Sequence, residues 1–381
     1  MNAPDWKITF ADNTVDEEEI EAVTAVLRSR WLSAGPRTAE FERDFATALR
    51  VEDAVAVNSG TAALHLAVIA LGIGPGDEVI MPSLTFVAGA AMTALQGATP
   101  VFADVRSELD LTIDPEEVKA LITPRTKAVI GMHYGGFPAD LDALGQIARS
   151  TGIALIEDAC HAPNVIDQWG RKLGTVGDVG CFSFFATKNM TTGEGGMVVA
   201  RDPAVRERIR STRAHSLTTT TWTRLRTGSV GYDVDGIGMN YRPTEITSAI
   251  GRIQLAKLRA DNKRRRELVE AYRSRLCTEP RIGIPFGNWF GEAGFHLMAV
   301  TLPDDVDREQ VRAALTAAGI QSSVHYPPTH LFSYYRERFA SDTRPLPVTE
   351  RLAGRLLSLP LHARLTVNDV DLVADTLLAA L

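Results

Sequence analysis

FSFFATKNMTTGEGGMVVA, residues 182–200, is the stretch that decides how this chain folds and what chemistry it supports. It starts as an apolar β-type run, presents Lys188 in a short polar turn, and passes through a glycine-rich turn into a second apolar run. Lysine is rarely placed between two core strands unless its amine is used. A desolvated ε-amine has a lowered pKa and becomes nucleophilic. A surface lysine in a turn is the alternative, but it fits poorly with the flanking Phe and Gly residues.

Short β-type runs alternate with helical patterns throughout residues 53–200. The runs are AVAV (54–57), DEVIMP (77–82), PVFADV (100–105), KAVIGMHY (127–134), IALIED (153–158), VGCFSFF (179–185) and GGMVVA (195–200). This alternation predicts an α/β fold with a mainly parallel, seven-stranded sheet covered by helices on both faces. Ligands of such sheets sit beyond the carboxyl ends of the strands, so functional residues should directly follow the apolar runs.

The remainder of the chain predicts a second, smaller domain. Residues 203–215 have a charged helical pattern, residues 216–238 form a long polar stretch expected to be a functional or disordered loop, and residues 245–272 are again helical. We interpret residues 1–254 as an N-terminal segment plus the large domain, and residues 255–381 as a small α+β domain. The KRRR run at 263–266 could bind phosphate, although a solvated helix face is favoured.

Composition restricts the class of protein. With 45% hydrophobic and 23% charged residues and a net charge of −7, the chain is typical of a soluble globular protein and not of a nucleic-acid binder. It shows no signal-peptide pattern and no apolar run long enough for a bilayer. Three cysteines without repeated spacing indicate reduced thiols in a cytoplasmic protein. Asp158, Cys160 and His161 lack a second ligand pair, so no metal site is expected.

A helix N-terminus follows the first strand, in NSGTAALHL (58–66). The backbone N–H groups at Gly60 and Thr61 would point out of the helix end, where the dipole is positive, and could bind a phosphate. Simple capping of the helix is the alternative. Ser183, five residues before Lys188, offers a hydroxyl suited to the same anion.

The strand IALIED ends in Asp158, which should lie at the carboxyl edge of the sheet. A carboxylate there can pair with a protonated pyridine nitrogen and keep a cofactor ring an effective electron sink. It could equally be a strand-end cap for the next loop. Phosphate cradle, pyridinium partner and Schiff-base lysine are together the three groups that pyridoxal 5'-phosphate (PLP) requires. Their coincidence indicates a PLP enzyme linked to its cofactor through Lys188.

The sequence resembles the DegT/DnrJ/EryC1/StrS family of sugar aminotransferases, which have the type I PLP-transferase (aspartate aminotransferase-like) fold. The resemblance covers nearly the whole chain. It is carried, in family order, by WLSAGPRTAEFE (31–42), NSGTAALHLA (58–67), PGDEVIMPSLTFVAGAAM (75–92), ATPVFADV (98–105), HYGGFPADLDAL (133–144), EDACHA (157–162), GCFSFFATKNMTTGEGGMVV (180–199), GMNYRPTEITSAIG (238–251) and VHYPPTHL (324–331).

The resemblance implies roles around the cofactor ring. Lys188 would carry PLP as a Schiff base and shuttle protons, Asp158 would pair with the pyridine nitrogen, and Phe86 would stack on the ring. His161 could pack against the ring or hydrogen-bond its substituents, but it stands where many relatives have Gln, and a purely structural histidine is the alternative. Two further departures, APN at 162–164 and Ser216 where Gly is frequent, concern the substrate entrance.

At the phosphate, the resemblance implies Gly60, Thr61 and Ser183 as ligands. Asn240, in GMNYR, would reach the phosphate of the neighbouring subunit's cofactor, which makes the enzyme a homodimer with shared active sites. The alternative is that Asn240 only caps the helix beginning near Pro243.

The implied reaction is a ping-pong transamination from an amino acid, expected to be L-glutamate, to a keto group of a nucleotide-linked deoxysugar. The prolines of VHYPPTH should preset the directions of His325 and Tyr326, which would shape the sugar pocket unless the loop is only a hinge turn. Lys188 argues against the family's dehydratases, in which histidine replaces lysine. Amination of a cyclitol (inosose) is not separated from sugar amination by any motif. A non-catalytic PLP-binding regulator predicts a missing lysine or a fused DNA-binding segment, and the sequence shows neither.

Overall fold

The computed structural model describes residues 6–339 and 344–381, so residues 1–5, part of the stretch considered for a signal peptide, lie outside it. The elements in chain order are α1 (Glu17–Ser29), α2 (Pro36–Leu49), β1 (Val55–Val57), α3 (Gly60–Ala70), β2 (Glu78–Pro82), α4 (Ala88–Leu95), β3 (Thr99–Ala103), β4 (Val105–Ser107), β5 (Asp110–Ile113), α5 (Pro115–Leu121), β6 (Thr126–Met132), η1 (Tyr134–Gly136), α6 (Leu141–Thr151), β7 (Ala154–Asp158), β8 (Val179–Ser183), β9 (Gly196–Ala200), α7 (Pro203–Thr212), α8 (Thr221–Thr227), α9 (Glu245–Leu276), β10 (Met298–Thr301), α10 (Arg308–Ala317), η2 (Thr329–Leu331), α11 (Ser333–Arg338), α12 (Pro347–Ala353), β11 (Leu356–Leu359) and α13 (Val367–Ala379).

Each predicted apolar run forms a strand of one sheet, which within the described residues has seven strands in the order β1–β9–β8–β7–β6–β2–β3. Neighbouring strands from β8 to β3 are parallel, and β9 is antiparallel to both β8 and β1. The predicted mainly parallel α/β sheet is therefore confirmed. Because β8 and β9 are antiparallel, no crossover helix is needed to join them, and the loop of residues 184–195 that connects them carries Lys188.

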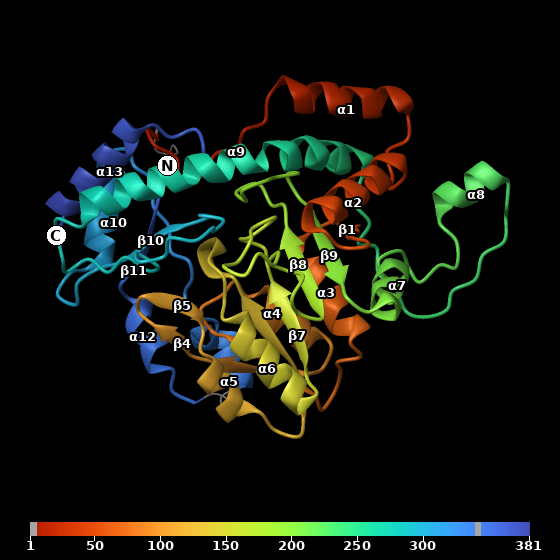
Figure 1. Ribbon diagram of the computed structural model, residues 1–381, viewed down its shortest axis with the longest axis horizontal. Coiled ribbons are helices and arrows are strands. Elements are labelled where there is room, and N and C mark those ends of the chain that lie inside the picture. Colours follow the sequence, from red (N-terminus) through yellow and green to blue (C-terminus); the bar gives the residue numbers. More distant parts are fainter. Residues whose placement is uncertain (1–5, 340–343) are drawn as a thin grey trace.

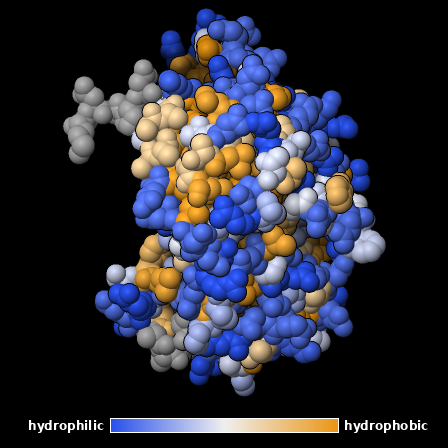
Figure 2. Space-filling view, turned by 90° about the vertical axis from the view of Figure 1, so that its left-hand side faces the viewer, coloured by the Kyte–Doolittle hydropathy of each residue, from blue (hydrophilic) through white to orange (hydrophobic). Residues whose placement is uncertain are grey.

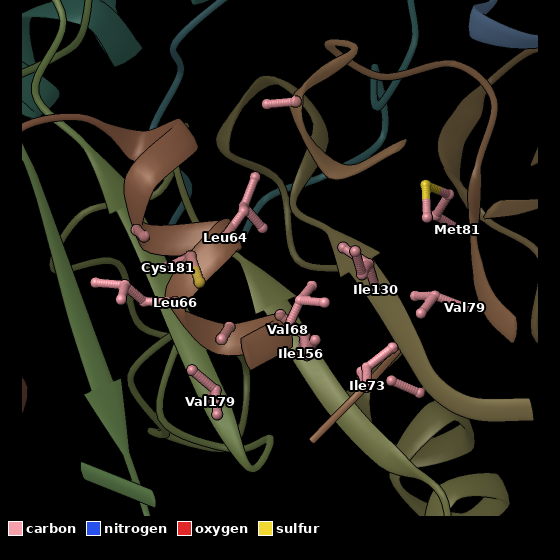
Figure 3. Packing of buried hydrophobic residues seen from close by; sticks show 14 of the residues in the cluster. Leu64, Leu66, Val68, Ile73, Val79, Met81, Ile130, Ile156, Val179 and Cys181 are labelled. Atoms are coloured by element: carbon pink, nitrogen blue, oxygen red, sulfur yellow. The ribbon is translucent and has the colours of Figure 1, made fainter. Parts of the chain in front are cut away.

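Helices cover both faces of the sheet, as Figure 1 shows. On one face, Leu64 and Val68 of α3 pack among side chains from β6, β7 and β8, including Ile156 and Val179 (Figure 3). On the other face, α5 and α6 pack against a separate apolar cluster that includes Ile80. Successive strand residues point to opposite faces, so a strand buried on both sides reads as the unbroken apolar run seen in the sequence.

The small domain is built around the far half of α9, a 32-residue helix that runs along one side of the molecule (Figure 1). It adds an antiparallel pair, β10 and β11, with α10 and α13. The predicted boundary at residue 254 falls inside the unbroken helix. The N-terminal segment also reaches this domain, since Ile8 bridges Ile320 and shares its apolar core. Figure 2 shows the end of the molecule facing left in Figure 1, which is largely hydrophilic with a hydrophobic area in its upper half.

Two expectations need correction. Residues 216–238 are not structureless, because α8 forms there with Thr220 as its N-cap and projects away from the body (Figure 1). None of the residues of α8 is buried. Because the helix has no buried face, its sequence lacks the apolar periodicity from which a helix could be predicted. The KRRR run is not a solvated face throughout, since Arg265 is 3% exposed and donates to the carbonyl oxygen of Leu361 at 2.9 Å. Within residues 6–339 and 344–381, none of the helices combines the length and the apolar character that a membrane span requires.

Candidate active site

Lys188 lies in the turn between β8 and β9, where its N–H donates to the carbonyl of Phe185 at 2.9 Å. The residue as a whole is half-buried, while Phe185 beside it is exposed. Burial of the ammonium lowers the pKa of Lys188, and the negative charge of Asp158 opposes this only in part. A larger fraction of the amine is therefore unprotonated at neutral pH than for an ordinary lysine, as nucleophilic attack on a carbonyl requires.

The N-terminus of α3 meets the end of β8 closely. A Cβ atom on Gly60 would lie 2.7 Å from Cβ of Ser183 and 3.1 Å from Sγ of Cys160, so glycine is required for this approach. Ser59 caps the helix by accepting from the N–H of Ala62 at 3.0 Å. Helix capping, the alternative interpretation of the NSGTAALHL motif, is therefore performed by Ser59. The first N–H groups of the helix and the Ser183 hydroxyl still lie together at the helix end, an arrangement suited to a phosphate.

Asp158 ends β7, beside Cys181 of β8, and is 7% exposed. Its Oδ1 accepts from the N–H of Cys160 at 3.1 Å, so the carboxylate does cap the following loop. A single such bond leaves the second oxygen available to another donor. Burial, followed by the charge of Asp158, raises the pKa of the Cys160 thiol well above its usual range, so this group is a neutral wall of the site.

His161 is 1% exposed and holds Tyr326 in the site. Its Nδ1 accepts from the N–H of Gly135 at 3.2 Å, and its Nε2 lies 2.9 Å from the hydroxyl oxygen of Tyr326. Burial lowers the pKa of His161 well below its usual value, so the ring is neutral. The tilted ring of Phe86 lies 6.1 Å from that of Tyr326 and is 56% exposed, which leaves its face free for a planar group.

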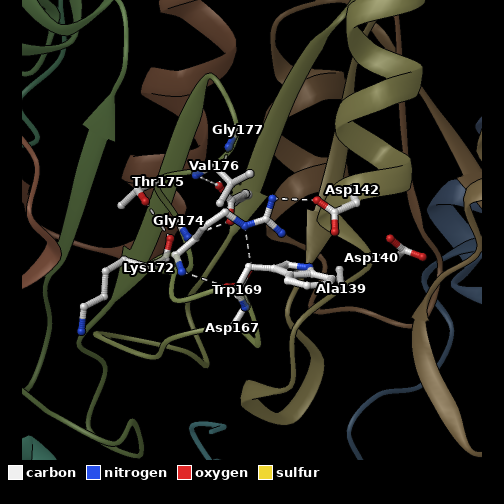
Figure 4. Close-up of polar contacts among 12 residues, drawn as sticks. Ala139, Asp140, Asp142, Asp167, Trp169, Lys172, Gly174, Thr175, Val176 and Gly177 are labelled. Atoms are coloured by element: carbon white, nitrogen blue, oxygen red, sulfur yellow. Dashed lines mark hydrogen bonds and ion pairs between the residues drawn. The ribbon is translucent and has the colours of Figure 1, made fainter. Parts of the chain in front are cut away.

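The loop after Asp158 is fixed by two charged groups, Glu157 and Arg171. Figure 4 shows part of this loop, with Asp167, Gly174, Val176 and Gly177, beside Asp142 of α6. The buried carboxylate of Glu157 accepts from the N–H groups of Gly174, Val176 and Gly177 at 2.6–2.7 Å. Arg171 bridges the loop to α6, donating to Asp167 within the loop and to Asp142 on the helix, each at 2.7 Å. These bonds fix residues 167–177 of the loop, and His161 at its start is held by its own bonds to Gly135 and Tyr326.

The remaining predicted residues take different places. The side chain of His325 is held by other partners, since its Nδ1 lies 3.0 Å from Oγ of Ser358 and its ring stacks on Phe10. Thr61 is half-buried at the start of α3. Asn240 is exposed, and its carbonyl oxygen lies 3.4 Å from Nδ2 of Asn58. Asn240 does not cap the following helix, because Thr244 does so in a capping box with Thr247.

Sequence reasoning gave no role to Tyr134 or Arg242. The hydroxyl of the buried Tyr134 donates to the carbonyl oxygen of His325 and so supports the VHYPPTH loop. Arg242 lines a cavity of about 940 Å³ between α2, α7 and residues 216–222, which is separate from Lys188 and Asp158, and burial lowers the pKa of its guanidinium. Both residues stand in quoted motifs, HYGGF and GMNYR, which were the available signal.

These residues fit PLP. The Gly60–Ser183 approach forms an anion cradle, Asp158 is a buried carboxylate at the neighbouring strand end, and Lys188 is a desolvated amine whose charge interacts with that carboxylate. An exposed aromatic face at Phe86 completes a site for a planar, phosphorylated, cationic ring.

The fold and these groups are those of a type I PLP-dependent aminotransferase. More specifically, the chain belongs to the DegT/DnrJ/EryC1/StrS aminotransferase family, whose model matches residues 13–378. It is 39% identical over 366 residues to the spore coat polysaccharide biosynthesis protein SpsC of Bacillus subtilis (strain 168), covering 95% of this chain and 94% of SpsC.

Solved structures agree. The aminotransferase TlmJ from Streptoalloteichus hindustanus superposes with a TM-score of 0.90 at 36% identity, covering 98% of each chain. DesI, solved in the presence of its TDP-sugar product, gives 0.88 at 33% identity over 100% of this chain and 94% of DesI. The sugar aminotransferase Spr1654 from Streptococcus pneumoniae, in its PLP form, gives 0.89 at 28% identity, covering 97% of both chains. The chain is therefore an aminotransferase, and its cofactor is PLP.

Proposed function

We propose that this enzyme transfers an amino group from L-glutamate to a keto group of a nucleotide-linked deoxysugar, as a step of amino-sugar biosynthesis. The observation that carries the chemistry is the desolvated amine of Lys188, whose charge interacts with that of Asp158, together with the close approach of Gly60 and Ser183. The substrate class is supported by DesI, solved with a TDP-sugar product, and by SpsC, a polysaccharide biosynthesis protein.

In this proposal each residue has a defined task. When bound, PLP supplies an electron sink that stabilises negative charge on the carbon from which a proton is removed. The Gly60 end of α3 and the Ser183 hydroxyl bind the phosphate, and Asp158 holds a proton at the ring nitrogen. The Nζ atom of Lys188 takes up and returns the transferred proton. Tyr326, held by His161, borders the space in which the sugar binds.

We further propose a homodimer in the cytoplasm, in which Asn240 serves the phosphate at the partner's site. Asn240 is exposed, and the N-cap of α9 is Thr244, so the Asn240 side chain is not needed as a cap. The projecting α8 and exposed side chains such as Val230 (94%) and Ile237 (90%) offer surface for a second copy. Three cysteines without a disulfide among the described residues suit a reducing compartment.

The test is direct. Lys188→Ala should abolish transamination and the borohydride-reducible cofactor link, while circular dichroism shows a folded protein. Wild-type enzyme should form amine from TDP-linked keto-deoxysugars with glutamate as donor, in a panel that includes glutamine and a keto-inositol. Turnover of the keto-inositol (inosose) alone would reassign the substrate to a cyclitol. Near wild-type activity of Lys188→Ala would show that Lys188 is not the lysine that carries the cofactor.

A further inference from the structure

Asn189 follows Lys188 directly, and its side chain makes three hydrogen bonds. It is 5% exposed. Its Nδ2 donates to Oδ1 of Asn262 on α9 at 2.8 Å and to the carbonyl oxygen of Gly294, and its Oδ1 lies 2.8 Å from Nδ1 of His296. Since both N–H groups of the amide have acceptors, the oxygen must receive the remaining bond, and His296 must donate it from Nδ1.

His296 in turn lies against the site. It is 7% exposed, and its ring centroid lies 4.2 Å from that of His161. Burial, together with the positive charge of Lys188, lowers the pKa of His296 well below its usual value. The ring is therefore neutral, and its single proton sits on Nδ1, as the bond to Asn189 requires.

The main chain around His296 is docked on the large domain. The N–H of His296 donates to the carbonyl oxygen of Gly135, and that of Gly294 donates to Gly136, both at 2.8 Å. A Cβ atom on Gly136 would lie 2.7 Å from Cα of Gly294, so the two segments pack backbone to backbone. The segment 294–296 thus has one fixed position relative to His161.

The turn that carries Lys188 needs such an anchor. Residues 185–187, which precede Lys188, are exposed, whereas Asn189 and Met190 are buried. The first side chain that ties the turn to other elements after Lys188 is Asn189. Displacement of Asn189 would move the adjacent Cα of Lys188 and swing its long side chain relative to Asp158.

We propose that Asn189 and His296 are positioning residues that hold the Lys188 amine in the site by tying its turn to α9 and to the segment 294–296. The inference rests on the proposed role of Lys188, and it extends the set of residues needed for reactivity to two that touch neither substrate nor cofactor. The hydrogen bond from Nδ1 of His296, and not the ring contact with His161, carries the effect.

Two substitutions of His296 separate these contributions. His296→Asn places an amide N–H near the position of Nδ1 and keeps the donor, whereas His296→Phe keeps a ring against His161 and removes the donor. Asn189→Ala removes the whole anchor. The readout is acetylation of Lys188 by acetic anhydride in the cofactor-free protein across pH, followed by peptide mass spectrometry, with the exposed Lys127 as internal reference.

In the wild type we expect Lys188 to titrate below the ordinary lysine value. In Asn189→Ala and His296→Phe, its apparent pKa should move by about one unit toward that ordinary value, while His296→Asn keeps the wild-type profile. An unchanged profile in both disruptive variants overturns the proposal, as does a His296→Asn profile that matches His296→Phe. If Asn189→Ala fails to fold, the comparison of His296→Asn with His296→Phe still tests the proposal. If wild-type enzyme showed no borohydride-reducible cofactor link, the proposed role of Lys188 would be refuted, but the titration of Lys188 in these variants could still be compared.

Discussion

The Nε2 atom of His161 lies 2.9 Å from the hydroxyl oxygen of Tyr326 and joins the loop after β7 to the VHYPPTH loop of the small domain. Because Nδ1 of the neutral ring accepts from Gly135, the proton is on Nε2 and is donated to Tyr326. The tyrosine hydroxyl therefore keeps its own proton for another acceptor. Burial and the charge of nearby groups, Asp158 among them, raise the pKa of Tyr326 well above its usual value, so it remains a neutral donor.

Tyr326→Phe tests this donor. We expect kcat/KM for the keto substrate to fall about tenfold, since the substitution removes the O–H group that would donate to the substrate, a hydrogen bond worth about 1–1.5 kcal/mol. Affinity for PLP should change little, because the phosphate cradle is untouched. Tyr334→Phe, at an exposed position on α11, is the matched control and should match the wild type. Equal kinetics for both variants would show that the Tyr326 hydroxyl is only structural.

Asp158→Asn separates the two roles of this residue. The amide keeps an oxygen for the N–H of Cys160, so the loop cap survives, but the negative charge is lost. We expect kcat to fall by at least about 100-fold, or about 2.7 kcal/mol of transition-state stabilisation, with a smaller loss of PLP affinity. Stopped-flow kinetics and equilibrium dialysis measure the two effects. Asp158→Asn with wild-type turnover would reduce the residue to a strand-end cap.

Gly60→Ala should damage the phosphate cradle. The added Cβ would lie 2.7 Å from Cβ of Ser183, and this overlap should cost about 1–3 kcal/mol of stability as the helix end and β8 separate. PLP affinity should fall in parallel. Gly74→Ala is the control, because the nearest atom to its Cβ would be 3.9 Å away. Calorimetry of the cofactor-free proteins and PLP titration give both quantities, and equal behaviour of the two variants would contradict the close approach.

Acid should destabilise the fold through His325. Burial, together with the positive charge of Lys188, lowers its pKa to about 4, below the ordinary value near 6.5. Between these values the unfolded chain binds more protons than the folded one, so stability is full above about pH 6.5 and falls as pH drops toward 4, by up to about 3 kcal/mol. Urea unfolding at pH 7 and pH 5 should show a smaller acid loss for His325→Asn. An unchanged loss would mean that His325 is not buried as a neutral ring.

The sheet was predictable because each strand is buried on both faces and therefore forms a continuous apolar run. The positions of Asp158 and Ser183 follow from the sheet, since these residues end β7 and β8, and Lys188 lies in the loop after β8. Contacts between distant segments were not predictable. The bond from His161 to Tyr326 spans 165 positions, and that from Asn189 to His296 spans 107, with no local pattern that pairs them. Helix α8 was not predicted because its N-cap, Thr220, is a polar residue of a kind that is equally common in loops, and no buried residues mark the helix.

Asn240 decides whether the active site is shared between two subunits. In one chain its side chain is exposed and its main chain lies beside Asn58, which precedes the phosphate cradle. An amide at that place could serve its own site or, across a two-fold axis, the partner's. Two-fold symmetry would make the exchange reciprocal, with two equivalent composite sites per dimer.

Mixing two inactive variants distinguishes these arrangements. Lys188→Ala lacks the reactive amine, and Asn240→Glu places a negative charge against the phosphate, so each homodimer should be inactive. In a heterodimer with shared sites, one site receives both lesions and the other receives none, because each subunit supplies Lys188 to its own site and Asn240 to its partner's. Activity per heterodimer should then return toward half of the wild-type value, and differently tagged subunits allow the heterodimer to be purified before assay. If Asn240 serves its own chain, each site of the heterodimer carries one lesion, and proven subunit exchange without recovery of activity would establish that arrangement instead.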